Sequence, residues 1–163
     1  MYKVSFTGYR PTKLPFFGED DPLCADLKAR IAAEITRLAD SGATEFFTGM
    51  ALGVDMWAAE AVLKLRESRP EITLTAMIPC RGQEIKWSVA QQRRYHDILS
   101  KCDKAICISH VYTKDCMHKR NRALVDICDV LIAVYDGQSG GTKYTYEYAL
   151  KCGKKVITVP PIA

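Results

Sequence analysis

The sequence lacks the features that would place it outside the ordinary globular proteins. It has no long apolar run, no block of like charges and no internal repeat, so neither a membrane-spanning segment nor a disordered tail is predicted. Its seven cysteines are odd in number, scattered and without a C-x-x-C pair, which argues against a disulfide framework and a zinc site. No basic segment followed by an apolar run opens the chain, so we expect no secretory signal and a cytoplasmic location.

The length and the net charge of the chain are also those of an ordinary globular protein. The 163 residues suffice for one domain, residues 1–163, whose core needs neither a metal nor a disulfide. A net charge of +4 is too small to indicate nucleic-acid binding by itself. None of the three histidines has an obvious serine or cysteine partner, and no spacing suggests metal ligands, so we assign no catalytic or metal-binding residue. The sequence is compatible with a homo-oligomer as well as with a monomer.

Short runs rich in β-branched and aromatic residues alternate with apolar stripes at helical spacing. The predicted strands are 3–7, 44–48, 72–78 (ended by Pro79), 104–109, 129–135 and 155–159. The predicted helices are 22–40 (capped by Asp21), 54–65, 87–100, 116–128 (capped by Asp115) and 142–152. This alternation predicts an α/β fold of the doubly wound kind, a mostly parallel sheet with helices on both faces.

Ligands of such sheets lie beyond the carboxyl ends of the strands, so the loops there are the candidate sites. Three of these loops carry unusual residues, namely 7–11 (TGYRP), 49–55 (GMALGVD) and 136–143 (DGQSGGTK). Their candidate ligand-binding residues are Thr7, Gly8, Gly49, Gly53, Asp55, Asp136, Gly140, Gly141 and Thr142. Glycine lets backbone N–H groups approach a phosphate, and the following helix start favours an anion. Each loop alone could be a tight turn. Three together favour a ligand.

Four further candidates are cationic or amide side chains. Arg10 and Arg81 follow the first and third strands, where a guanidinium could clamp a phosphate or form a surface ion pair. Arg120 and Asn121 lie in the first turns of the predicted helix 116–128, where several side chains are cationic. These cations either bind an anion or are exposed to solvent. Asp55 could favour its helix dipole or hold a ribose hydroxyl.

Two common nucleotide fingerprints do not fit. The glycines at 49 and 53 are four residues apart and do not form G-x-G-x-x-G, which argues against a Rossmann dehydrogenase. The segment 137–144 (GQSGGTKY) has Thr142 and Tyr144 where a P-loop needs glycine and serine or threonine. We therefore predict no NTPase.

Four segments together carry a family resemblance: TGYRP (7–11), GMALGVDMWAAE (49–60), CMHKRN (116–121) and VYDGQSGGT (134–142). In this order and spacing they resemble the YpsA-like family of bacterial proteins, within the SLOG superfamily of Rossmann-like domains. The resemblance implies a nucleotide, NAD or ADP-ribose ligand against the 49–55 and 140–142 loops, and a sensor or regulatory role.

Two relatives of that superfamily imply alternatives. Residues 49–55 are similar to a motif of the DNA-processing protein A family, which binds single-stranded DNA. Residues 140–142 (GGT) are similar to part of the motif of the LOG phosphoribohydrolases, which cleave the N-glycosidic bond of nucleoside monophosphates. That motif continues to a glutamate three residues after its threonine, where this chain has Thr145. Glu147 lies about 200° around the helix from that position, so it cannot simply replace the family's carboxylate.

Overall fold

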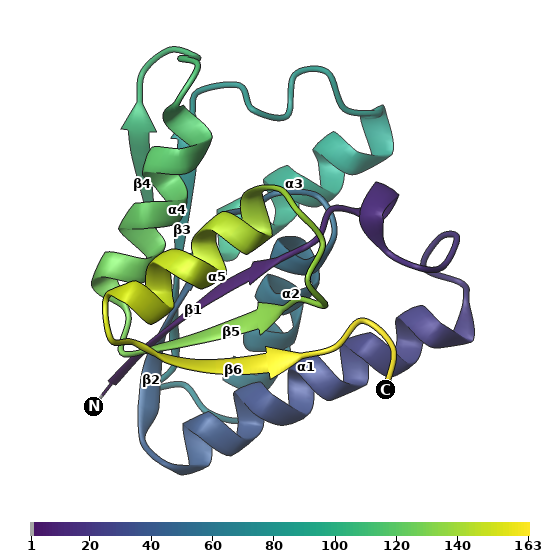
Figure 1. The fold of residues 1–163 in the computed structure, drawn as a ribbon, viewed down its shortest axis with the longest axis vertical. Coiled ribbons are helices and arrows are strands. Elements are labelled where there is room, and N and C mark those ends of the chain that lie inside the picture. Colours follow the sequence, from purple (N-terminus) through teal and green to yellow (C-terminus); the bar gives the residue numbers. More distant parts are fainter. Residues whose placement is uncertain (1) are drawn as a thin grey trace.

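The computed structural model describes residues 2–163, which form one six-stranded parallel sheet with five α-helices (Figure 1). The strands are β1 (Tyr2–Gly8), β2 (Ala43–Thr48), β3 (Thr73–Cys80), β4 (Lys104–Ser109), β5 (Val130–Val134) and β6 (Lys155–Val159). The helices are α1 (Pro22–Asp40), α2 (Val54–Arg66), α3 (Val89–Lys101), α4 (Cys116–Ile127) and α5 (Gly141–Lys151), with a 3₁₀ turn at Pro11–Lys13. The predicted doubly wound fold is confirmed.

The strand order is β4-β3-β2-β1-β5-β6. The chain winds outward from β1 to β4, then returns through α4 to place β5 on the other side of β1, so the strand order reverses between β1 and β5. Helices α1, α2 and α3 pack side by side on one face, and α4 and α5 pack together on the other. Figure 1 shows α5 in front of β1 and the β1–α1 and β5–α5 loops beyond the arrowheads of both strands.

Apolar periodicity explains how the helices attach to the sheet. In α1, Asp21 caps the helix by accepting from the Leu23 N–H at 2.9 Å, and Pro22 occupies its first turn. The buried stripe of this helix is Cys24, Leu27, Ile31, Ile35 and Leu38. Strand β5 is buried along all its length, as expected for a strand with neighbours on both sides and helices above and below. None of the helices in residues 2–163 is long and apolar enough to cross a bilayer.

Two predicted boundaries and one predicted side-chain cap differ from the structure. Strand β3 continues through Pro79 to Cys80, because β2 pairs with β3 only as far as Ala76 and the missing proline N–H breaks no bond on that side. Helix α3 begins after Ser88, which forms a capping box with Gln91, and not at Trp87. Asp115 precedes α4 but does not cap it, because its carboxylate accepts from the Thr113 hydroxyl at 3.1 Å.

Candidate functional site

A cavity of about 280 Å³ lies beyond the carboxyl end of β1, at the reversal of strand order next to β5. This is the place where doubly wound sheets bind their ligands. The β1–α1 loop, the loop and first turn leading into α2, and the first turns of α4 and α5 form its wall. The lining residues are Phe6, Thr7, Gly8, Tyr9, Arg10, Thr12, Lys13, Ala51, Asp55, Met117, His118, Arg120, Asn121, Gly141 and Thr142.

Hydrogen bonds join the two loops on either side of the switch point. The Tyr9 hydroxyl donates to the Asp136 carboxylate at 2.7 Å and accepts the backbone N–H groups of Asp136 and Gln138 at 3.1 and 3.0 Å. The Lys13 ammonium donates to the Ser139 carbonyl at 2.5 Å. The hydrogen bond from Tyr9 lowers the pKa of Asp136, and burial raises the pKa of Tyr9. These hydrogen bonds fix the β1–α1 and β5–α5 loops relative to each other.

The start of α5 is open toward the cavity. Gly140 occupies the N-cap position with a φ of 131°, and no side chain caps the helix. A Cβ at Gly140 would collide with the Lys13 ammonium, so glycine is required both for the backbone conformation and for the approach of Lys13. Gly141 and Thr142, the first residues of α5, line the cavity. Their end of the helix offers free N–H groups and partial positive charge to an anion.

Asp55 and Arg120 bring opposite charges to the buried side of the cavity, with only 7% and 3% of each residue exposed. Arg120 donates from Nη1 to the Gly49 carbonyl at 2.5 Å and from Nε to Asn121 Oδ1 at 2.8 Å. Asp55 Oδ2 accepts one long hydrogen bond, from the Ala51 N–H at 3.3 Å. Within residues 2–163 neither side chain forms an ion pair within 4.0 Å.

Burial dominates the electrostatics of these two groups. It raises the pKa of Asp55, and the nearby Arg120 charge opposes that shift. It lowers the pKa of Arg120, and the Asp55 charge opposes the shift in turn. Gly49 makes the arrangement possible, because an added Cβ there would lie 2.8 Å from both Arg120 Nη1 and Asp55 Oδ2.

The loop between β2 and α2 is tightly constrained. Met50 has a φ of 58°, the one left-handed non-glycine residue in the described part of the chain, and its side chain is fully buried. Gly53 has a φ of 90°, and a Cβ there would lie 2.9 Å from Pro11 Cδ and the Tyr9 carbonyl. The β2–α2 and β1–α1 loops therefore touch at Gly53, and this close approach accounts for that glycine.

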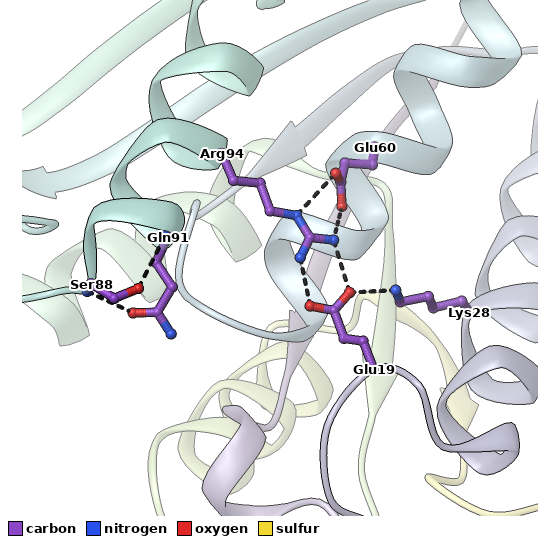
Figure 2. A network of polar contacts seen from close by, with 6 residues as sticks. All are labelled: Glu19, Lys28, Glu60, Ser88, Gln91 and Arg94. Atoms are coloured by element: carbon purple, nitrogen blue, oxygen red, sulfur yellow. Dashed lines mark hydrogen bonds and ion pairs between the residues drawn. The ribbon is translucent and has the colours of Figure 1, made fainter.

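A polar network holds the far end of the β1–α1 loop (Figure 2). The Arg94 guanidinium on α3 donates to both oxygens of Glu60 on α2 at 3.1 and 2.6 Å, and to both oxygens of Glu19 at 2.5 and 2.9 Å. Lys28 on α1 adds a hydrogen bond to Glu19 at 2.5 Å. Pairing with Arg94 lowers the pKa of Glu19 to about 2. This network closes a second, mostly apolar cavity of about 230 Å³, which has Trp57 in its wall.

The structure separates the predicted site residues into two groups. Thr7, Gly8, Arg10, Asp55, Arg120, Asn121, Gly141 and Thr142 line the cavity. Gly49, Gly53, Asp136 and Gly140 lie behind this lining and shape it through the contacts described above. Arg81 is exposed just after β3 and is not part of the wall.

Several lining residues were not among the candidates. Tyr9 belongs to a segment singled out for its glycine and arginine, and its hydroxyl is the centre of the contact between the loops. Lys13 reaches the cavity because a 3₁₀ turn reverses the chain after Pro11, which no periodicity signals. His118 is part of the basic start of α4, and only the packing of α4 against α5 shows that it faces the cavity.

Comparison with known proteins gives one family and one fold. A model of the YspA SLOG family matches residues 4–158. A UPF0398 protein of Halalkalibacterium halodurans is 31% identical over 157 residues, which span 95% of this chain and 82% of that protein.

Two solved structures share the fold. DNA processing protein A of Streptococcus pneumoniae has a TM-score of 0.67 at 20% identity, over 98% of this chain and 50% of that one. DNA processing protein A of Helicobacter pylori, described for its single-stranded DNA binding, has a TM-score of 0.64 at 22% identity, over 98% and 65%.

Proposed function

Since the chain belongs to the YspA SLOG family, as its motifs predicted, we propose that it binds a nucleotide or a nucleotide derivative such as NAD or ADP-ribose, as a sensor or regulator. The observation that carries this proposal is the uncapped start of α5 opening into a cavity that Arg10 and Lys13 also line. Backbone N–H groups and cations around one cavity form a phosphate site.

In this proposal a phosphate lies at the Gly140–Thr142 loop, against Gly141 and Thr142 in the cavity wall, and the sugar or a second phosphate lies toward Asp55. Arg10 is exposed, and within residues 2–163 the one hydrogen bond of its guanidinium goes to the Met117 sulfur at 4.0 Å, which leaves the other N–H groups able to pair with the phosphate. The Asp55 carboxylate has unused acceptor capacity toward the cavity, because one long hydrogen bond occupies it. A sugar hydroxyl is the group that such a carboxylate binds.

Thermal unfolding with nucleoside monophosphates, NAD and ADP-ribose tests the proposal. A ligand at about 100 times its Kd stabilises the folded state by about 2.7 kcal/mol, which raises the Tm of a chain of this size by roughly 5–10 °C. Gly141→Asp places a negative charge at the phosphate position and should abolish the shift. Ala90→Asp, which adds the same charge in the first turn of α3, is the matched control and should keep it. The placement is wrong if the shift survives Gly141→Asp.

Phosphoribohydrolysis of nucleoside monophosphates is the alternative that the GGT segment favours. Two observations weigh against it. Thr145 is buried and its hydroxyl donates to the Gly141 carbonyl at 2.8 Å, while Glu147 is exposed on the outer side of α5 beside Arg122 and Tyr144. Asp55 is the single carboxylate in the cavity wall. Incubation with nucleoside monophosphates followed by chromatography for free base decides the matter, since base release that Asp55→Asn abolishes would make the chain an enzyme.

Single-stranded nucleic acid is the second alternative, favoured by the cations at the start of α4 and by the fold shared with DNA processing protein A. Phosphate contacts of this kind make binding strongly salt-dependent. An electrophoretic mobility assay at low salt tests it, and the absence of a shifted band would dismiss it.

A further inference from the structure

The size of the cavity limits how much of a nucleotide it encloses. Its volume is about 280 Å³. Pockets that enclose a whole drug-sized ligand have roughly 300–1,000 Å³. The cavity volume lies just below this range, which favours partial enclosure of a nucleotide, with the phosphate and sugar inside and the base outside.

Few of the buried polar side chains in the described wall are left to recognise a base. Asn121 Oδ1 accepts a hydrogen bond from Arg120 Nε, and Asn121 Nδ2 lies 3.9 Å from the position that a Cβ on Gly141 would take. Arg120 is occupied by Gly49 and Asn121. Discrimination between bases needs buried polar groups that pair with one base and are left unpaired by another. The buried polar side chains of the described wall are Thr7, Asp55, Arg120 and Thr142. In the proposed pose Thr142 faces the phosphate and Asp55 the sugar, so neither recognises the base.

An aromatic strip borders the cavity on the α4–α5 side. His118 is exposed and is part of the wall, and its ring packs against Tyr144 with centroids 4.7 Å apart and planes at 72°. Arg122 in turn holds the Tyr144 ring in place. Arg122 Nε donates a hydrogen bond to the Tyr144 hydroxyl at 2.6 Å, and the Arg122 guanidinium lies 5.7 Å from the centroid of the Tyr144 ring. His118 is thus supported at the cavity opening by a fixed neighbour.

We propose that the base of the bound nucleotide lies outside the cavity against His118, so that the protein recognises phosphate and sugar and accepts all four bases. This inference rests on the proposed nucleotide site. Stacking on an aromatic ring tolerates any base, because every base has a π face. The ligand class is then ribonucleotides in general, and His118 is a residue that adds affinity without selecting the base.

Calorimetric titration of the full chain with AMP, GMP, CMP, UMP and ribose 5-phosphate tests the inference. We expect the four nucleotides to bind with Kd values within about fivefold of one another. His118→Ala should weaken each of them about tenfold, as expected for one stacking contact, and leave ribose 5-phosphate unchanged. His118→Phe, which keeps a flat ring, should restore most of the nucleotide affinity. His96→Ala on α3, where His96 pairs with Glu84, is the matched control and should bind like the parent protein.

The possible results distinguish failure of this inference from failure of the proposed nucleotide site. Ribose 5-phosphate binding together with a strong preference for one base, or nucleotide affinity indifferent to His118→Ala, overturns the inference and leaves the phosphate–sugar site standing. Failure of ribose 5-phosphate and of all four nucleotides to bind overturns both. Circular dichroism of each variant excludes misfolding as the cause of lost affinity.

Discussion

Two arginine–carboxylate clusters in this molecule differ in whether their charged groups form direct ion pairs. Arg94 bridges Glu19 and Glu60 with four hydrogen bonds at the surface, and Lys28 completes the network (Figure 2). Arg120 and Asp55 are buried at the cavity, and their side-chain hydrogen bonds go to backbone and to uncharged side chains. Paired charges hold a loop in place. In the buried cluster the Asp55 carboxylate accepts one long hydrogen bond and keeps acceptor capacity for a ligand, which is why we place the site there.

Arg120→Ala should give the largest effect on stability. It leaves the Gly49 carbonyl and the Asp55 carboxylate buried without the cation, and the loss of one partner of such a set costs about 3–5 kcal/mol. Urea unfolding measures the change. An unfolding free energy equal to that of the parent protein would show that Arg120 has no structural role at the cavity.

Gly49→Ala should destabilise by about 1–3 kcal/mol, because its Cβ would lie 2.8 Å from both members of the buried cluster. Gly141→Ala is the matched control, since its nearest neighbour is 3.9 Å away and its φ is not left-handed. The two variants should separate clearly in thermal unfolding. Equal melting temperatures would mean that the cluster at Gly49 can relax without cost.

The two clusters should respond to pH with opposite signs. The pKa of Glu19 falls from 4.5 to about 2, so its ion pairs stabilise the folded state above about pH 4.5 and lose that contribution as the pH falls through 2. The pKa of Asp55 is raised above 3.8, so its contribution is present below 3.8 and is lost as the pH rises through the raised value.

Unfolding free energies of Glu19→Gln and Asp55→Asn from pH 2 to 7 measure this contrast. Glu19→Gln should differ from the parent protein most at pH 7, by at most about 1 kcal/mol, because solvent screens this partly exposed site. Asp55→Asn should gain stability relative to the parent as the pH rises. Profiles that move in the same direction would contradict the assigned shifts.

Glu60→Gln should have the smallest effect, about 0.5 kcal/mol or less, because Arg94 keeps both hydrogen bonds to Glu19 and the site is 40% exposed. It should leave nucleotide affinity unchanged. A loss of affinity in this variant, measured by calorimetry, would connect the surface network to the cavity and break the distinction between the two clusters.

The parts of this molecule that local patterns determine were predictable. Apolar periodicity located every strand and helix to within a few residues, because each element buries one face or both. The carboxyl ends of parallel strands all lie at one edge of the sheet, so the common location of the three glycine loops was also predictable. Distances across the fold were not predictable. The burial of Arg120 depends on Gly49, 71 residues away, and the turn that brings Lys13 to Ser139 has no periodic signature.

The arginines at 10 and 81 provide the most direct test of the central claim. Both are exposed and follow strands, but only Arg10 lines the cavity. If the cavity binds the phosphate of a nucleotide, Arg10→Ala should weaken the calorimetric Kd for AMP by about tenfold or more, the effect of one charge-assisted hydrogen bond, and Arg81→Ala should leave it unchanged. Equal affinities for the two variants, or no binding by the parent protein, would contradict the account.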